Sequence, residues 1–245
     1  MKVFKKVLII VLSVILVAVT GIFALWHNEI ATVASITTII DQDLSHDDGY
    51  TYEMNVSGEY YFDDFLKQGG VSSDEELIQF ITGNITKGVI PMTIQTKEIA
   101  CSSFTAWTED QQFVFGRNYD FDETNTAIVH TNPKGRHASV STIDLQFLGI
   151  DEKNGITGIK EKALLLAAPY IPLDGINDAG VACGIYMTYQ GEPTSPTNQN
   201  TEKPDITSTT LLRLILDYAD NVEEAIELAS QYDMHDSAGT SYHYM

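Results

Sequence analysis

Arginine and cysteine are scarce in this sequence, and their scarcity excludes several kinds of site. The 245-residue chain has only Arg117, Arg136 and Arg213, and its two cysteines are Cys101 and Cys183. Two cysteines exclude a disulfide-dense scaffold and a four-cysteine zinc site. Three arginines make an arginine-rich phosphate clamp a poor interpretation.

Positive charge is also scarce. Lys and Arg total 14 against 34 Asp and Glu, which gives a formal net charge of −20 at pH 7. Such a surface repels polyanions, so we do not expect nucleic acid as a partner. The six histidines show no spacing typical of metal ligands, and we expect neither a metal nor another cofactor. A hydrophobic content of 44% predicts a folded core.

The N-terminal 28 residues contain no acid and carry one long apolar run. Lys2, Lys5 and Lys6 precede an uncharged stretch from Val7 to Trp26. Its 20 residues, at about 1.5 Å each, match the roughly 30 Å hydrocarbon core of a bilayer. The lysines are expected to stay inside. We therefore predict a signal anchor over 1–28 that holds an extracellular domain at the cell membrane; the alternative is a cleaved signal peptide and a secreted protein.

The next segment, 29–100, has a mostly helical pattern. Ser73 followed three residues later by Glu76 is a capping-box signature that predicts the start of a helix. A shorter helix is expected around Tyr60–Gln68, before a glycine pair.

The pattern changes at Cys101 and becomes rich in β-strand signals. Strands are predicted over 101–108, 112–117, 126–131, 139–148, 162–170 and 181–189, and helices over 208–218 and 221–232. The last residues, 240–245, begin like a strand and stop, which is typical of an edge strand or of a truncated chain.

Cys101 stands at the start of the first of these strands, sixteen residues before Arg117. If the first two strands form a hairpin, Arg117 and Asp120 can both reach the Cys101 sulfur. A neighbouring guanidinium favours the nucleophilic thiolate, and a carboxylate can orient an amine or accept a proton. The alternative is a buried free cysteine beside a local Arg–Asp salt bridge.

Two motifs resemble one known family. CSSFTA at 101–106, followed by FGRNYD at 115–120, resembles the start of the mature chain in the choloylglycine hydrolase (linear amide C–N hydrolase) family. DGINDAGVACG at 174–184 resembles the family's D-G-x-N-x-x-G segment. The family includes bile salt hydrolases, penicillin V acylases and, more distantly, acid ceramidase. The resemblance covers roughly 101–245 and implies an α+β N-terminal nucleophile hydrolase with stacked αββα layers.

The resemblance also implies a mechanism. Cys101 would be the nucleophile, freed by cleavage of the Ala100–Cys101 bond, and its new α-amine would be the base, with Arg117 and Asp120 beside it. Segment 29–100 would become a propeptide or a retained small subunit. The substrate would be the linear amide of a small N-acylated molecule: an N-acyl amine or lipid amide, a conjugated bile acid, an acyl homoserine lactone or penicillin V.

The chain departs from the family pattern at Met187, where bile-salt-type members place an asparagine that binds the oxyanion. A thioether cannot donate a hydrogen bond, so Met187 weakens the bile-salt interpretation. Tyr186 is a candidate replacement donor, and Asn177 is a second candidate, although it is most simply a turn residue. The family's later asparagine and arginine have no counterpart before Met245, so we expect a C-terminally truncated, incomplete sandwich.

Apolar side chains near these motifs are expected to line an acyl pocket. The candidates are Phe104, Tyr119, Phe121, Ile185 and Met187. A homo-oligomer is possible. The competing hypotheses are an inactive, truncated family member and a surface-anchored ligand-binding protein with a structural Cys101.

Overall fold

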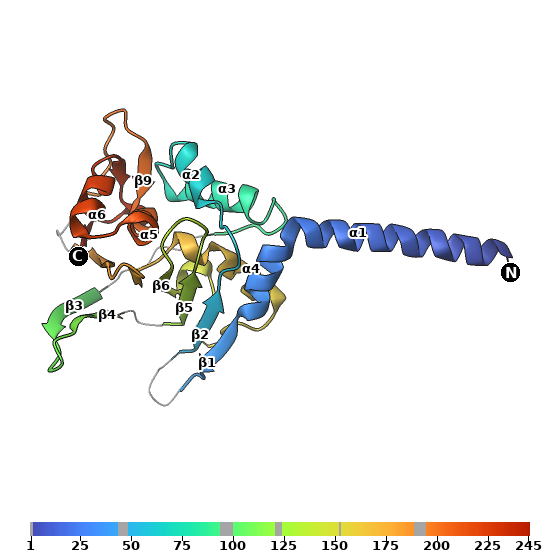
Figure 1. Cartoon of the computed structure of the whole chain (residues 1–245), viewed down its shortest axis with the longest axis horizontal. Coiled ribbons are helices and arrows are strands. Elements are labelled where there is room, and N and C mark those ends of the chain that lie inside the picture. The colour runs from blue at the N-terminus through green and yellow to red at the C-terminus, as the bar shows by residue number, and fades with distance from the viewer. Residues whose placement is uncertain (1, 44–48, 94–99, 121–123, 152, 189–194) are drawn as a thin grey trace.

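The N-terminal helix α1 (Lys2–Ser35) projects from one side of a sheet-based domain (Figure 1). The computed structural model describes residues 2–43, 49–93, 100–120, 124–151, 153–188 and 195–245. The first part of α1 is exposed, and the helix leaves helical geometry at Trp26, where φ is −128° and ψ is 22°. It is long and apolar enough to cross a membrane, as an anchor or a signal sequence would be.

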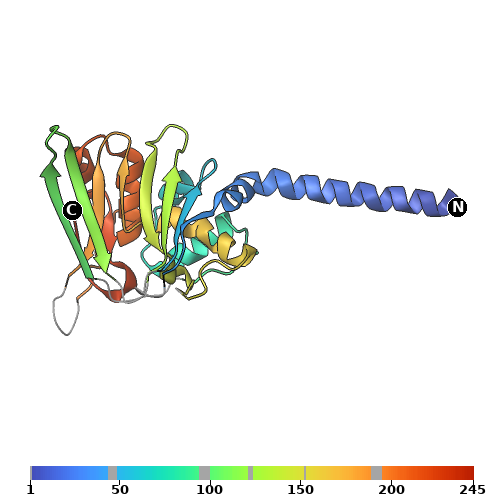
Figure 2. The ribbon, with the colours of Figure 1, turned by 90° about the horizontal axis from the view of Figure 1, so that it is seen from below.

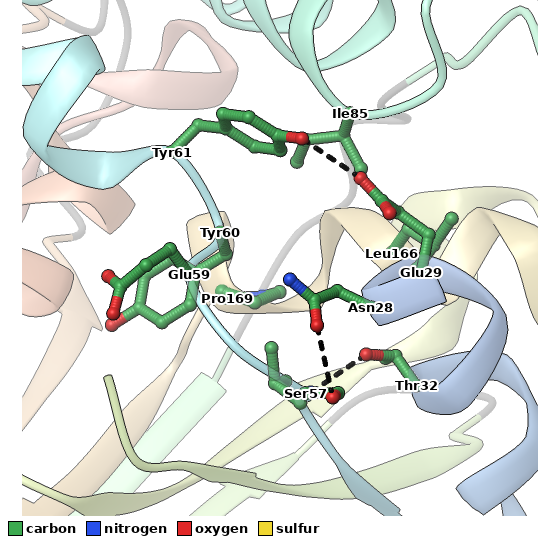
Figure 3. Close-up of a pocket in the computed structure, with 11 residues that line it drawn as sticks. Asn28, Glu29, Thr32, Ser57, Glu59, Tyr60, Tyr61, Ile85, Leu166 and Pro169 are labelled. Carbon is green, nitrogen blue, oxygen red and sulfur yellow. Dashed lines mark hydrogen bonds between the residues drawn. The ribbon is translucent and has the colours of Figure 1, made fainter. Parts of the chain in front are cut away.

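The part of α1 that follows Trp26 is fixed to the domain by polar contacts with residues 57–61 (Figure 3). The Ser57 amide donates to Thr32 Oγ1 at 2.8 Å, and the Tyr61 hydroxyl donates to Glu29 Oε1 at 3.1 Å. Only a glycine fits at position 58, where φ is +70° and the backbone passes close to α1. A Cβ there would lie 2.4 Å from the Asn28 side chain. The exit direction of α1 is therefore set by the fold.

A seven-stranded sheet forms the centre of the domain, in the order β1-β2-β5-β6-β7-β8-β11. β2 and β5 are parallel, and the other neighbours are antiparallel. The strands are β1 (Thr37–Ile40), β2 (Thr51–Asn55), β5 (Thr126–Thr131), β6 (Ser139–Asp144), β7 (Asp174–Asn177), β8 (Ala182–Met187) and β11 (Tyr242–Tyr244). A separate parallel pair joins β9 (Asp205–Thr207) and β10 (Asp233–His235).

The pre-segment was expected to be mostly helical, but residues 29–100 also supply the strands β1 and β2. The Thr-Thr-Ile-Ile run of β1 is β-branched, and Tyr52 and Met54 of β2 alternate into the core. The two expected helices are present as α2 (Phe62–Lys67) and α3 (Asp74–Asn84). Ser73 Oγ caps α3 by accepting from the Glu76 amide at 3.3 Å.

Helices cover one face of the sheet. α5 (Ser208–Tyr218) packs on β7 and β8, and α6 (Val222–Ala229) packs on α5. The predicted strand over 162–170 was wrong: this stretch forms the end of α4 (Ile159–Leu164) and the 3₁₀ helix η2 (Leu165–Tyr170). Its Leu and Ala residues favour helix over strand. Shorter 3₁₀ turns are η1 (Leu145–Leu148), where the β6 strand was expected to continue, and η3 (Ser237–Gly239).

The predicted hairpin is confirmed as β3 (Ala100–Trp107) and β4 (Phe113–Asp120). It lies at the end of the domain farthest from α1 in both ribbon views (Figures 1 and 2). Gly175 of β7 faces Leu216 of α5, whereas its neighbour Asp174 contacts Arg117 of β4. The hairpin therefore packs on the face of the sheet opposite to α5.

A buried ionic cluster joins the pre-segment to the rest of the domain. Asp217 of α5 accepts from the Tyr60 hydroxyl at 2.6 Å and from Arg136 Nη1 at 2.7 Å. Arg213 Nη1 lies 3.2 Å from Asp217 Oδ1 and also donates to Thr131 at 3.1 Å. Burial raises the pKa of the Asp217 carboxyl, and the two arginines oppose that shift. Buried charges of this kind are tolerated only when they are paired.

We predict that Asp217→Ala destabilises the chain by about 3–5 kcal/mol, because it removes the buried carboxylate that Arg213 and Arg136 share, and Arg136 keeps only partly exposed carboxylates such as Glu59. The measurement is urea unfolding of the full chain in detergent micelles. Asp64→Ala is the control, because Asp64 forms an exposed pair with Lys67 at 3.3 Å and should cost less than about 1 kcal/mol. Equal losses in the two variants would contradict a special role for the cluster.

Candidate active site

The register of the β3–β4 hairpin places Cys101 and Arg117 on one face. Cys101 pairs with Tyr119, and Ser103 pairs with Arg117. Residues two apart on a strand share a face, so Cys101, Ser103 and Arg117 lie together. Diagonal neighbours of this kind are typically about 7–8 Å apart. The sixteen-residue spacing between Cys101 and Arg117 predicted that a hairpin would bring them to the same end, and the β3–β4 register agrees with this.

Arg117 connects the hairpin to β8 and β7. Its side chain is only 6% exposed. Nη2 donates to the Ile185 carbonyl at 2.6 Å, and the guanidinium lies 4.3 Å from the centre of the Tyr186 ring. Nε lies 3.6 Å from Asp174 Oδ2. These contacts hold a positive charge on the face of the hairpin that carries Cys101.

Asp174 is a site residue that the sequence analysis did not select. Burial raises the pKa of its carboxyl, while the Thr142 hydroxyl, which donates at 2.6 Å, and the Arg117 guanidinium lower it. The sequence did offer one signal for Asp174: it is the first residue of the D-G-x-N segment. The carboxylate fixes Arg117 from the sheet side, and this makes Asp174 a positioning residue.

Part of the expected site lies outside the described residues. The backbone of Asp120 pairs with that of Ala100, and Tyr119 pairs with Cys101. The side chains of Tyr119 and Asp120 are not among the described ones, and neither is Phe121. The roles given to these three residues therefore remain predictions.

The two oxyanion candidates have different surroundings. Asn177 is buried, and its side chain is fully used in the turn: Nδ2 donates to the Ala219 carbonyl at 2.8 Å, and Oδ1 accepts from the Val181 amide at 2.9 Å. The Tyr186 hydroxyl is buried and has no hydrogen-bond partner within the described part of the chain. Of the two candidates, Tyr186 therefore has the hydroxyl that can still donate a hydrogen bond, and its ring lies against Arg117.

The expected acyl-pocket residues do not converge. Phe104 alternates with Cys101 and Ser103, so it lies on the other face of β3, where it is 61% exposed and covers Gly116. Ile185 and Met187 alternate with Tyr186 along β8 and so lie on the opposite face of that strand from its ring. Phe104 therefore does not face the hairpin side that carries Cys101, and Ile185 and Met187 do not share a face with the Tyr186 ring; the pocket itself stays a prediction, because the side chains of Tyr119 and Phe121 are not described.

A different cavity adjoins the Cys101 face of the hairpin. It measures about 860 Å³ and is open at the surface. Thr105 of β3 and Phe113 and Phe115 of β4 line it, together with Ile176 and Ala182 of the sheet and apolar residues of α5 and α6. Strand alternation puts Thr105 on the face of Cys101, and Phe113 and Phe115 on the face of Arg117. Counting alternate residues from Cys101 and Arg117 was the signal that could have found this pocket.

The two cysteines differ in accessibility. Both are free, so no disulfide joins Cys101 to Cys183 in this structure. Cys183 is a buried residue of β8, and burial raises the pKa of its thiol to about 12, although Arg213 opposes the shift. Cys101 is partly exposed.

A thiol, a fixed guanidinium and an apolar cavity on one hairpin face are suited to acyl transfer to sulfur. Residues 101–242 match the model of the linear amide C–N hydrolases, choloylglycine hydrolase family, which is more than half of the chain. The chain belongs to this family of hydrolases, and its mixed α/β fold with one large sheet is compatible with that membership. No curated protein and no solved structure gives a significant match.

We predict that iodoacetamide at pH 8 modifies Cys101 and spares Cys183 in the folded chain. The reagent reacts with thiolates, and a buried thiol with a pKa of about 12 supplies almost none at that pH. Peptide mapping by mass spectrometry measures both sites. Labelling after urea denaturation, where both thiols should react, is the control. Equal labelling of the two cysteines in the native chain would refute the prediction.

Proposed function

We propose that this chain is a cysteine amidase that hydrolyses the linear amide of a small N-acylated molecule through a thioester on Cys101. The observation that carries the proposal is the shared face of Cys101 and Arg117, which continues into the apolar cavity beside Phe115. Family membership supports amide C–N hydrolysis in general. The nucleophile and the substrate class are our additions.

Activation would begin at the peptide bond between Ala100 and Cys101, at the start of β3. The Cys101 sulfur attacks the Ala100 carbonyl carbon, the C–N bond breaks, and the thiol proton passes to the departing nitrogen. Water then hydrolyses the resulting thioester. The products are a carboxylate on Ala100 and a free thiol and α-amine on Cys101.

The same groups would then carry out the amidase reaction. The α-amine of Cys101, with an ordinary pKa of about 8, takes the thiol proton, and the sulfur attacks the substrate carbonyl. The proton passes to the departing amine as the amide bond breaks. Water hydrolyses the acyl thioester, releases the carboxylic acid and restores the thiol. The Tyr186 hydroxyl is our candidate for an oxyanion donor, and Arg117 and Asp120 would position the amine and the substrate.

The apolar cavity indicates the acyl group. Phe113, Phe115 and Ile176 present hydrocarbon to it, and its volume of about 860 Å³ lies in the range of small-molecule pockets. We infer that it holds the acyl chain of the substrate. Together with Met187 in place of the asparagine of bile-salt-type members, this favours an N-acyl amine or lipid amide over a conjugated bile acid.

The pre-segment would remain bound after cleavage as a small subunit. β2 lies inside the sheet between β1 and β5, and Tyr60 belongs to the buried Asp217 cluster. Release of residues 29–100 would expose the edge of β5 and leave two buried arginines with fewer partners. We also propose that α1 is an uncleaved anchor, with its lysines inside and the domain outside the cell.

We predict that the full chain in lipid vesicles is cut into fragments 1–100 and 101–245, whereas Cys101→Ala remains intact. Intact mass and N-terminal sequencing measure the cut. Cys183→Ala is the matched control and should be processed like the unaltered chain, because Cys183 is buried in β8 on the face opposite to Tyr186 and Arg117. Cleavage in Cys101→Ala, or none in the unaltered chain, would refute self-processing at this bond.

The same sample tests retention of the pre-segment. The two fragments should co-elute from a size-exclusion column in detergent and separate only after denaturation. Separate elution under native conditions would show that 29–100 is a released propeptide.

We predict that Phe115→Ala changes the acyl-chain preference, lowering kcat/KM about tenfold for long acyl chains and much less for acetyl. The measurement is amine release from a series of N-acyl amines that differ only in chain length. Phe104→Ala is the control, because its ring lies on the outer face of the hairpin. If the two variants have the same chain-length profile, the acyl group does not lie in this cavity.

A further inference from the structure

A second apolar cavity lies at the base of α1, away from the candidate active site. It measures about 690 Å³ and lies between the C-terminal part of α1, the chain after α3, and α4. Its walls include Ile22 and Trp26 of α1, Ile90, and Ile159 and Leu166. Figure 1 shows α1, α3 and α4 meeting on the side of the domain from which α1 leaves.

The rim of this cavity exposes large apolar side chains. Val89 is 69% exposed, Ile159 is 73% exposed and Ile30 is 43% exposed. All three side chains line the same cavity, so their exposed surfaces form one apolar patch. An apolar patch of this kind is typical of a surface that contacts another apolar phase.

The cavity is continuous with the proposed membrane span. Ile22 and Trp26 belong to the uncharged run and also to the cavity wall. Trp26 is the last residue of that run and the point where the helix kinks. A tryptophan is favoured at the level of the lipid headgroups, so the cavity begins where the hydrocarbon core ends.

The charges around the rim suit lipid headgroups. Lys87 Nζ lies 5.8 Å from the Trp26 ring centre and 3.6 Å from Glu29, which places its charge at the level of the kink. Lys160 is exposed in the first turn of α4, next to Ile159. In a chain with a net charge of −20, lysines are the side chains that can attract headgroup phosphates.

We propose that this cavity and its rim dock the domain on the bilayer, with the acyl chain of an outer-leaflet phospholipid in the cavity. The proposal rests on the anchor role of α1 proposed above. The contacts of Thr32 and Glu29 with residues 57–61 fix α1 against the domain, so the rim meets the membrane in one orientation (Figure 3). The hairpin of Cys101 lies at the far end (Figures 1 and 2). Docking therefore holds the candidate site open to the medium.

Tryptophan quenching by brominated lipid tests the docking. The full chain carries Trp26 and Trp107, so each native residue can be read alone after Trp→Phe substitution of the other. The test variants place one tryptophan on the rim, as Val89→Trp or Ile159→Trp, with Trp26→Phe and Trp107→Phe in the background. Each is reconstituted in phosphatidylcholine vesicles with and without bromine on the acyl chains.

We expect the tryptophan at 89 and the one at 159 to be quenched to at least half the extent of Trp26. Trp107, which is exposed at the tip of the distant hairpin, should not be quenched. If Trp26 is quenched but neither rim position is, the anchor stands and the docking is overturned. If Trp26 is not quenched, both the anchor and the docking are overturned. Quenching of Trp107 equal to that of the rim would overturn the orientation.

Discussion

Asp217 is fully buried between two guanidinium groups, and this pairing constrains the rest of the structure. A buried carboxylate and two buried arginines stabilise a fold only in the arrangement that satisfies all of them. Tyr60 completes that arrangement from the pre-segment, and its carbonyl accepts from the buried Tyr170 hydroxyl at 2.5 Å. The loop that carries Tyr60 also fixes α1 through Ser57 and Tyr61. The direction in which α1 leaves the domain therefore depends on a charge cluster inside the domain.

Arg117 has a corresponding role at the other end of the molecule. Among the described residues the β3–β4 hairpin shares no strand pairing with the large sheet, so side-chain contacts help to set its position. The bond from Arg117 to the Ile185 carbonyl and the ion pair with Asp174 supply such contacts. Arg117, which shares a hairpin face with Cys101, is thus also a residue that places the hairpin on the sheet. Fold and site are coupled at this side chain.

Local signals explain which features the sequence could predict. The Ser73 and Asn221 caps and the β3–β4 hairpin depend on residues within a few turns or strands of each other, and the structure has all of them. β2 was missed because it lies between β1 and β5, and its parallel partner β5 is far along the chain, where no local pattern in 29–100 indicates it. The run at 162–170 has no periodicity that separates a buried strand from a helix. The cavity beside Phe115 was not predicted, because apolar residues were chosen near the motifs without asking which strand face each one occupies.

Charge and geometry together narrow the kind of substrate that reaches Cys101. The hairpin lies far from α1, so under the proposed anchoring we expect a substrate to approach through the medium rather than along the bilayer. A net charge of −20 gives the domain a negative field, which lowers the local concentration of anionic molecules and leaves neutral ones unaffected. Conjugated bile acids and penicillin V are anions, whereas N-acyl amines and acyl homoserine lactones are neutral. The negative field therefore favours an uncharged N-acyl amide as the substrate, which is the class that Met187 and the apolar cavity also favour.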